Sequence, residues 1–152
     1  MRCMMIIKTS KEPDAGKMPS KEAFEEMSKF NEQIAKAGIL LDMGGLKGTA
    51  HGTKVKFSGG KKTIVDGPFA EAKEVVLGYW IVQVKSREEA VEWAKRAPVA
   101  PSPDDEVEIE VRQLGEIEDF PETERVVAAK AAGKKAGETY KEIAKEAREG
   151  KK

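Results

Sequence analysis

The order of strand-like and helix-like segments constrains this chain most strongly. Apolar or alternating runs predict strands at residues 1–8, 39–43, 53–57, 62–65, 75–85 and 107–111. Two segments between them repeat apolar residues at helical spacing: Ala23, Met27, Phe30, Ile34 and Ala37 in the first, and Ala90, Trp93, Ala94 and Ala97 in the second. This order predicts an α+β fold of the ferredoxin-like, split βαβ type, with an antiparallel sheet and both helices on one face.

The ends of both helices carry recognisable signals. Ser20 is a suitable N-cap for the first helix, which Gly38 terminates. Ser86 and Glu89 form a capping box at the start of the second helix, and Pro98 stops it.

The sheet must have a second face that the helices do not cover. We expect Tyr79 or Trp80, Met43, Phe57 and Val65 to point toward it. An apolar layer of this kind is unfavourable in water. Two copies can bury it by packing sheet to sheet, so the pattern predicts a two-fold homodimer.

Composition excludes several classes of partner. The 152 residues suit one domain with a tail, and 27 basic residues balance 27 acidic ones, so we expect neither nucleic acid nor anionic lipid as a partner. No apolar run is long enough to span a bilayer, and the first residues lack a signal-peptide core, so we expect a cytoplasmic protein without membrane contact. The single cysteine, Cys3, excludes an intramolecular disulfide and is expected in the core of the first strand.

A change of composition marks the end of the domain. We place the domain at residues 1–120 and a tail at 121–152, rich in Ala, Lys and Glu. Tyr140, Ile143, Ala144 and Ala147 keep a weak helical stripe, which favours a C-terminal helix. A disordered tail is the alternative, because the apolar content is low.

The stretch from Val65 to Glu74 is the best candidate for a site. Asp66, Gly67 and Pro68 combine three turn-forming tendencies, so the chain must turn sharply after a strand. Charged residues then follow Phe69 within the same loop. Charges gathered at a strand junction indicate a candidate binding or catalytic site.

Asp66 is the leading catalytic candidate. A carboxylate bordered by apolar residues is suited to proton transfer, since partial burial favours its protonated form. The alternative is a turn-forming aspartate that accepts the backbone amides of Phe69 and Ala70. Glu71 and Lys73 are candidates for binding a polar ligand group, or are simply solvated. His51 is a second catalytic candidate, although loop histidines are commonly exposed.

The run Asp66 to Glu74, with Gly78-Tyr79-Trp80 and Glu108 to Gln113, resembles the YCII-related proteins of the DGPF subgroup. The likeness covers roughly residues 1–120. It implies a dimeric α/β barrel with a cleft between the two sheets.

This chain departs from the usual family pattern at several positions. Gly44 stands where relatives have a glutamate and Lys47 where they have a histidine, while Ala72 and Ala97 replace a threonine and a cysteine. Deliberate redesign of a natural scaffold is one hypothesis for these replacements, and a genome that encodes this chain unchanged would refute it.

These observations predict a homodimer that binds a small organic molecule in the inter-sheet cleft, with Asp66 assisting proton transfer or lyase-type chemistry. The expected apolar walls are Met43, Phe57, Phe69, Tyr79 and Trp80. No nucleotide-binding motif is present and one histidine does not make a metal site, so we expect no cofactor or metal. The alternative is a non-enzymatic regulatory or protein-interaction module that uses the loop and the tail.

Overall fold

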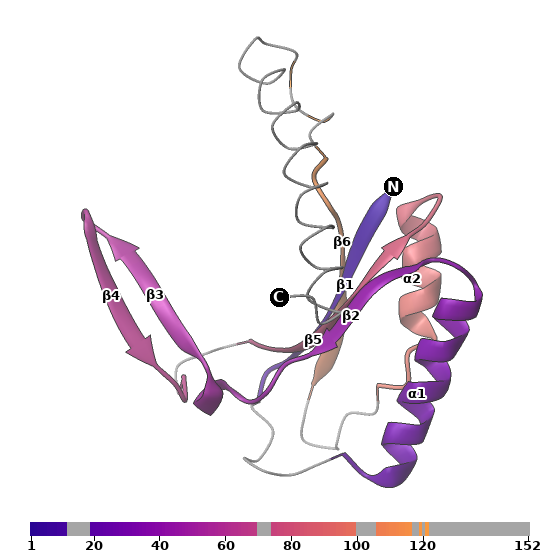
Figure 1. Ribbon diagram of the computed structural model, residues 1–152, viewed down its shortest axis with the longest axis horizontal. Coiled ribbons are helices and arrows are strands. Elements are labelled where there is room, and N and C mark those ends of the chain that lie inside the picture. The colour runs from indigo at the N-terminus through magenta and orange to yellow at the C-terminus, as the bar shows by residue number, and fades with distance from the viewer. Residues whose placement is uncertain (12–18, 70–73, 100–105, 117–118, 120, 122–152) are drawn as a thin grey trace, which may run out of the picture. The chain divides into compact units, whose positions relative to one another are not determined.

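A computed structural model of the chain describes residues 1–11, 19–69, 74–99, 106–116, 119 and 121 (Figure 1). The chain divides into two units, Met1–Leu114 and Gly115–Lys152. The elements of the first unit are β1 (Arg2–Thr9), α1 (Lys21–Lys36), β2 (Leu40–Gly45), a short 3-10 helix η1 (Thr49–His51), β3 (Thr53–Ser58), β4 (Lys61–Asp66), β5 (Val75–Gln83), α2 (Arg87–Lys95) and β6 (Val107–Gln113). The tail helix predicted beyond residue 121 lies outside the described residues.

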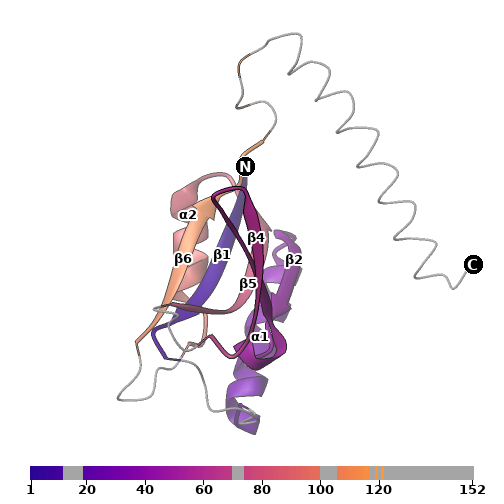
Figure 2. The ribbon, with the colours of Figure 1, turned by 90° about the vertical axis from the view of Figure 1, so that its left-hand side faces the viewer.

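Four strands form one antiparallel sheet in the order β2-β5-β1-β6. The strands β1 and β2, joined through α1, flank β5, whereas β5 and β6, joined through α2, flank β1. Both helices lie on the same side of this sheet, behind the strands in Figure 2. The predicted α+β fold, with an antiparallel sheet and two helices, is therefore confirmed.

The core lies between this sheet and the helices. Cys3 and Met5 of β1 pack with Trp80 of β5 and with Phe30 and Ile34 of α1, and all five are buried. The Trp80 ring meets the Phe30 ring edge to face at 5.5 Å between centroids. Cys3 occupies the core position predicted for it, and burial raises the pKa of its thiol.

The helix ends agree with their sequence signals. Ser20 Oγ accepts a hydrogen bond from the Ala23 amide at 3.1 Å, and Ser86 Oγ accepts one from the Glu89 amide at 3.2 Å. Gly38 ends α1 with a φ of 73°, a conformation that favours glycine. Among the described helices, none combines the length and the apolar character that crossing a membrane requires.

The prediction for the open face of the sheet is wrong for Trp80 and Met43. Trp80 belongs to the helix-covered core, and Met43 is its direct cross-strand partner, so both lie on the helix side. Of the two alternatives on β5, Tyr79 is the one on the open face. The strand is apolar at both parities, so its sequence pattern did not indicate which parity faces the helices.

The strands β3 and β4 form the predicted hairpin, but as a separate two-stranded sheet (Figure 1). Gly59 and Gly60 make the turn with positive φ values of 56° and 75°. Phe57 and Val65 therefore lie on this ribbon and not on the four-stranded sheet, which corrects their predicted position. Alternation reveals the two faces of a strand but not the sheet to which it belongs.

Candidate functional site

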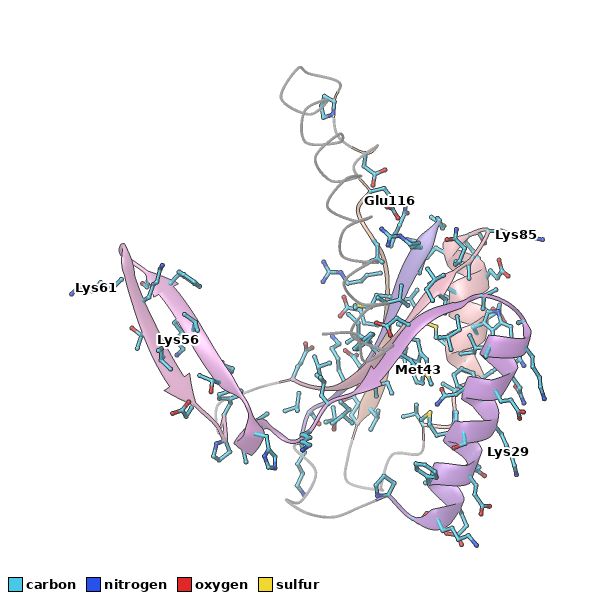
Figure 3. All side chains as sticks on the ribbon, in the orientation of Figure 1. Lys29, Met43, Lys56, Lys61, Lys85 and Glu116 are labelled. Atoms are coloured by element: carbon cyan, nitrogen blue, oxygen red, sulfur yellow. The ribbon has the colours of Figure 1, made fainter. Side chains whose placement is uncertain are left out.

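A cavity with a volume of about 640 Å³ lies on the helix side of the sheet, in the described part of the chain. Met43 on β2 marks its position in Figure 3. Its walls come mainly from the first half of α1, from β2 and β5 and from the segment after α2, with one residue each from β1 and β6. The main apolar side chains that line it are Phe24, Met27, Met43, Leu46, Leu77, Trp80, Pro98 and Val99.

Few polar groups line this cavity. Among its described walls, the ionisable side chain on the helix side is that of Glu26, and neither lysine nor arginine contributes. Tyr79 also borders the cavity, but its side chain lies on the open face of the sheet. The Asn31 side chain also lines it, and its Oδ1 accepts a hydrogen bond from Trp80 Nε1 at 2.8 Å. A mainly apolar cavity of this volume is typical of small-molecule sites.

Glycines let β2 and β5 approach closely beside the cavity. A Cβ atom on Gly78 would lie 2.7 Å from the backbone oxygen of Gly44, and one on Gly44 would lie 3.1 Å from the Tyr79 ring. Gly44 and Gly45 are the last two residues of β2, and the register shift of β2 falls between Leu40 and Asp42.

The Tyr79 hydroxyl has a defined partner on β2. It donates a hydrogen bond to Asp42 Oδ2 at 3.2 Å, while Asp42 Oδ1 accepts the Met43 amide at 2.9 Å. The hydrogen bond to Asp42 raises the pKa of Tyr79. Tyr79 therefore keeps its proton at neutral pH, and its ring is held in place against β2.

At the turn after Asp66, the aspartate side chain does not accept the Phe69 amide that follows it. Asp66 ends β4, and its Oδ1 accepts a hydrogen bond from Thr53 Oγ1 at 2.8 Å. The Phe69 amide donates to Thr49 Oγ1 at 3.1 Å, so the prediction that Asp66 accepts this amide is wrong. The Thr49 hydroxyl of η1 takes the place of the aspartate as acceptor of this amide. The Gly67 amide also donates a hydrogen bond to the Gly52 backbone oxygen at 2.8 Å, which holds the turn against η1.

Phe69 packs at the base of the hairpin. Lys54 Nζ lies 4.1 Å from the centre of its ring, and Gly52 lies against the ring edge. His51 is the exposed last residue of η1. The sequence candidates thus divide between two places: Met43, Tyr79 and Trp80 line the cavity, whereas Asp66, His51, Phe57 and Phe69 lie on the hairpin or at its base. Glu71 and Lys73 lie outside the described residues.

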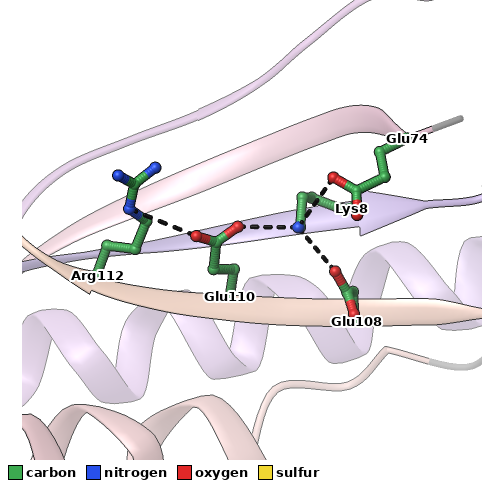
Figure 4. A network of polar contacts seen from close by, with 5 residues as sticks. All are labelled: Lys8, Glu74, Glu108, Glu110 and Arg112. Carbon is green, nitrogen blue, oxygen red and sulfur yellow. Dashed lines mark hydrogen bonds and ion pairs between the residues drawn. The ribbon is translucent and has the colours of Figure 1, made fainter. Parts of the chain in front are cut away.

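A charged cluster on the open face of the sheet was not anticipated (Figure 4). Lys8 Nζ lies 2.8 Å from carboxylate oxygens of both Glu108 and Glu110 and 3.1 Å from Glu74, and only 12% of its side chain is exposed. Arg112 contacts Glu110 at 3.4 Å. The carboxylates of Glu108, Glu110 and Glu74 raise the pKa of Lys8, and the hydrogen bond from Lys8 lowers the pKa of Glu110.

Sequence signals for the missed residues were present but weak. Phe24 is a large apolar residue beside the predicted helix stripe, and it is 66% exposed next to the cavity. Lys8 ends an apolar strand, and glutamates alternate along β6. Only the register of β1 against β6, in which Lys8 pairs with Glu108, brings these charges together. Within the described ranges, no three His, Cys, Asp or Glu side chains are grouped to hold a metal ion.

Comparison with known proteins identifies the family of this chain. Residues 1–118 match the YCII-related domain. The chain is also 30% identical, over 79 residues, to the uncharacterized protein R00369 of Rhizobium meliloti (strain 1021). That match covers 52% of this chain and spans 64% of the length of the relative. Because the domain match covers most of the sequence, this chain belongs to the YCII-related domain family.

Proposed function

We propose that this protein is a homodimer that binds a small, neutral, mainly apolar organic molecule in the cavity beside Trp80. The observation that carries the proposal is the cavity itself, about 640 Å³ in volume and walled mainly by apolar residues. Sites for drug-sized ligands commonly have volumes of roughly 300–1,000 Å³ and a few oriented polar groups. Asn31 supplies such a group, while Glu26 makes an anionic ligand unfavourable.

The open face of the sheet supports the homodimer. Met4, Ile6, Tyr79 and Ile81 lie on it in cross-strand contact, and each is only half-buried in the single chain. A second sheet packed on this face would remove apolar area from water, at about 25 cal/mol per Å². We also propose that the dimer forms a barrel with a cleft between the two sheets. Membership of the DGPF subgroup is likewise a proposal.

A neutral solvatochromic dye tests the binding site directly. Nile red should bind the wild-type protein and fluoresce more strongly, because the cavity removes it from water. Ala23 lines the cavity on α1, so Ala23→Phe places a ring into the space and should weaken dye binding at least tenfold. Fluorescence titration at fixed protein concentration measures the dissociation constant.

The same substitution elsewhere on α1 is the matched control. Ala35 is exposed and does not line the cavity, so Ala35→Phe should leave the dissociation constant within twofold. Equal weakening by the two variants, or no binding by the wild-type protein, would exclude this cavity as the site.

The catalytic role of Asp66 and His51 is a separate part of the proposal. Neither residue lines the cavity in this structure, so they would act only on a molecule held near the base of the hairpin. Once a compound that the protein converts is found, Asp66→Asn should lose turnover while it keeps dye binding. Unchanged turnover in a folded Asp66→Asn protein would remove Asp66 from the mechanism, and His51→Ala tests the second residue in the same assay.

An interaction module is the second candidate function. The observation that favours it is the exposed hairpin, on which Val55, Phe57 and Ile64 are all more than half exposed. A regulatory protein that contacts its partner through this ribbon or through the tail would need no turnover. Loss of partner binding without any change in Nile red binding, after alteration of the hairpin, would favour this function.

A further inference from the structure

The hairpin of β3 and β4 has one apolar face. Val55 pairs with Ile64 and Phe57 pairs with Lys62, so these four side chains lie on the same face of the ribbon. Their exposed fractions are 51% for Val55, 70% for Ile64 and 72% for Phe57. Lys54, Lys56 and Lys61 lie on the other face, by alternation along the strands.

Such a ribbon is incomplete by itself. A two-stranded hairpin without a covering layer is at best marginally stable in water. Nearly every residue of β3 and β4 is exposed, so no other described segment covers either face of it. An apolar face of three large side chains therefore requires a partner surface that is also apolar.

Charge indicates what kind of surface that is. Residues 53–66 contain four lysines and one aspartate, so the ribbon has a net charge of +3. The 27 basic and 27 acidic residues of the whole chain cancel, and the remainder of each copy consequently has a net charge of −3. A second copy of this chain is thus complementary in charge to the ribbon.

We propose that the hairpin is an arm that lies across the open sheet face of a second copy. In this arrangement the apolar face of the arm covers the cluster of Met4, Ile6, Tyr79 and Ile81 on the partner's sheet. Lys62, whose Nζ lies 5.8 Å from the centre of the Phe57 ring, then reaches the carboxylates around Lys8. The inference rests on the proposed homodimer and adds that each copy contributes its arm to the other.

The receiving face has both features that the arm needs. Its apolar centre is half-buried, as Ile6 pairs with Tyr79 and Met4 pairs with Ile81. At one end, the three carboxylates of Glu74, Glu108 and Glu110 contact two cations, Lys8 and Arg112, which leaves one net negative charge. That end therefore has spare negative charge for an additional lysine.

Two neighbouring substitutions on β4 test the arm with the full chain. Ile64 lies on the apolar face and Thr63 on the opposite one, and both changes to aspartate add one negative charge. Sedimentation equilibrium should show that Ile64→Asp raises the dissociation constant of the dimer at least tenfold. Thr63→Asp should leave it within twofold.

Disulfide trapping locates the contact. Phe57→Cys protein is mixed with protein that carries Met4→Cys, Ile6→Cys or Ile81→Cys, and mild oxidation should link the two different copies in at least one mixture. A dimer that persists while all three mixtures fail to cross-link would overturn the arm. Equal effects of the two aspartate variants on the dissociation constant would also overturn it. So would binding of a DNA duplex by the ribbon, if Ile64→Asp leaves dimerisation unchanged.

The outcome is separable from that of the proposed ligand site. The arm residues do not line the cavity, so Ile64→Asp should retain Nile red binding. A protein that is monomeric at every concentration measured overturns the arm, whereas absence of dye binding overturns the cavity.

Discussion

At the scale of single residues, backbone packing decides which glycines matter. A Cβ atom on Gly67 would lie 1.7 Å from the backbone oxygen of Thr49 and 3.2 Å from that of Gly52. Backbone cannot move aside as a flexible side chain can, so this turn requires a residue without a Cβ atom. The glycine of the stretch Asp66 to Phe69 is therefore explained by the close packing of this turn against η1.

Gly67→Ala should lower the free energy of unfolding by about 2 kcal/mol, in the range of overpacked sites. Thermal unfolding followed by circular dichroism measures the change. A Cβ atom on Gly45 would meet no atom within 4 Å, and the φ of Gly45 is not positive, so Gly45→Ala is the control and should stay within about 0.5 kcal/mol. If Gly67→Ala is as stable as the control, the turn can move away from η1 at little cost in free energy.

At the scale of elements, charges join strands that are far apart in sequence. Lys8 of β1 contacts Glu108 and Glu110 of β6, and also Glu74 immediately before β5. The pKa of Glu110 is lower in the folded protein than its ordinary value of 4.5. The ionised Glu110 therefore stabilises the folded protein above pH 4.5, and this stabilisation is lost as the pH falls through the lowered pKa. The raised pKa of Lys8 contributes stability below 10.5, which is lost only in strong alkali.

Lys8→Met should therefore lower the melting temperature by a few degrees at pH 7, because three carboxylates lose their common cation. The difference from the wild-type protein should narrow as the pH falls below 4.5 and through the lowered pKa of Glu110, where that carboxylate becomes protonated. Calorimetry from pH 3 to pH 8 measures both curves. Lys29→Met, which removes an exposed lysine of α1, is the control for the charge change, and an unchanged difference down to pH 3 would contradict the ion-pair explanation.

The elements also show how far the sequence leads. Periodicity and caps predicted both helices and all six strands, since helix stripes, Ser20, Ser86 and Gly38 are local signals. The sheet to which a strand belongs is not set by local sequence, so the prediction placed Phe57 on the wrong sheet. For the same reason, one of its two alternatives placed Trp80 on the wrong face. Met43, Tyr79 and Trp80 were expected in a cleft between two sheets, whereas the cavity that they border lies on the helix side of the sheet. Phe24 and Leu46 were missed because only the folded chain brings α1 beside the end of β2.

At the scale of the whole molecule, the organisation separates the domain from the tail. The first compact unit ends at Leu114, and the match to the YCII-related domain ends at residue 118. The cavity and the charged cluster use residues of the first unit alone. Removal of residues 121–152 should consequently leave the melting temperature within about 4 °C and the affinity for Nile red within twofold.

A protease site introduced after residue 120 makes this comparison within one sample, because the uncut protein is the control for the cut one. If the protein acts by binding a ligand in its own cavity, dye binding survives the cut. If it acts through a partner held by the tail, dye binding survives but the partner is lost. Unfolding after the cut would contradict the division at residue 120, and would make the tail part of the domain.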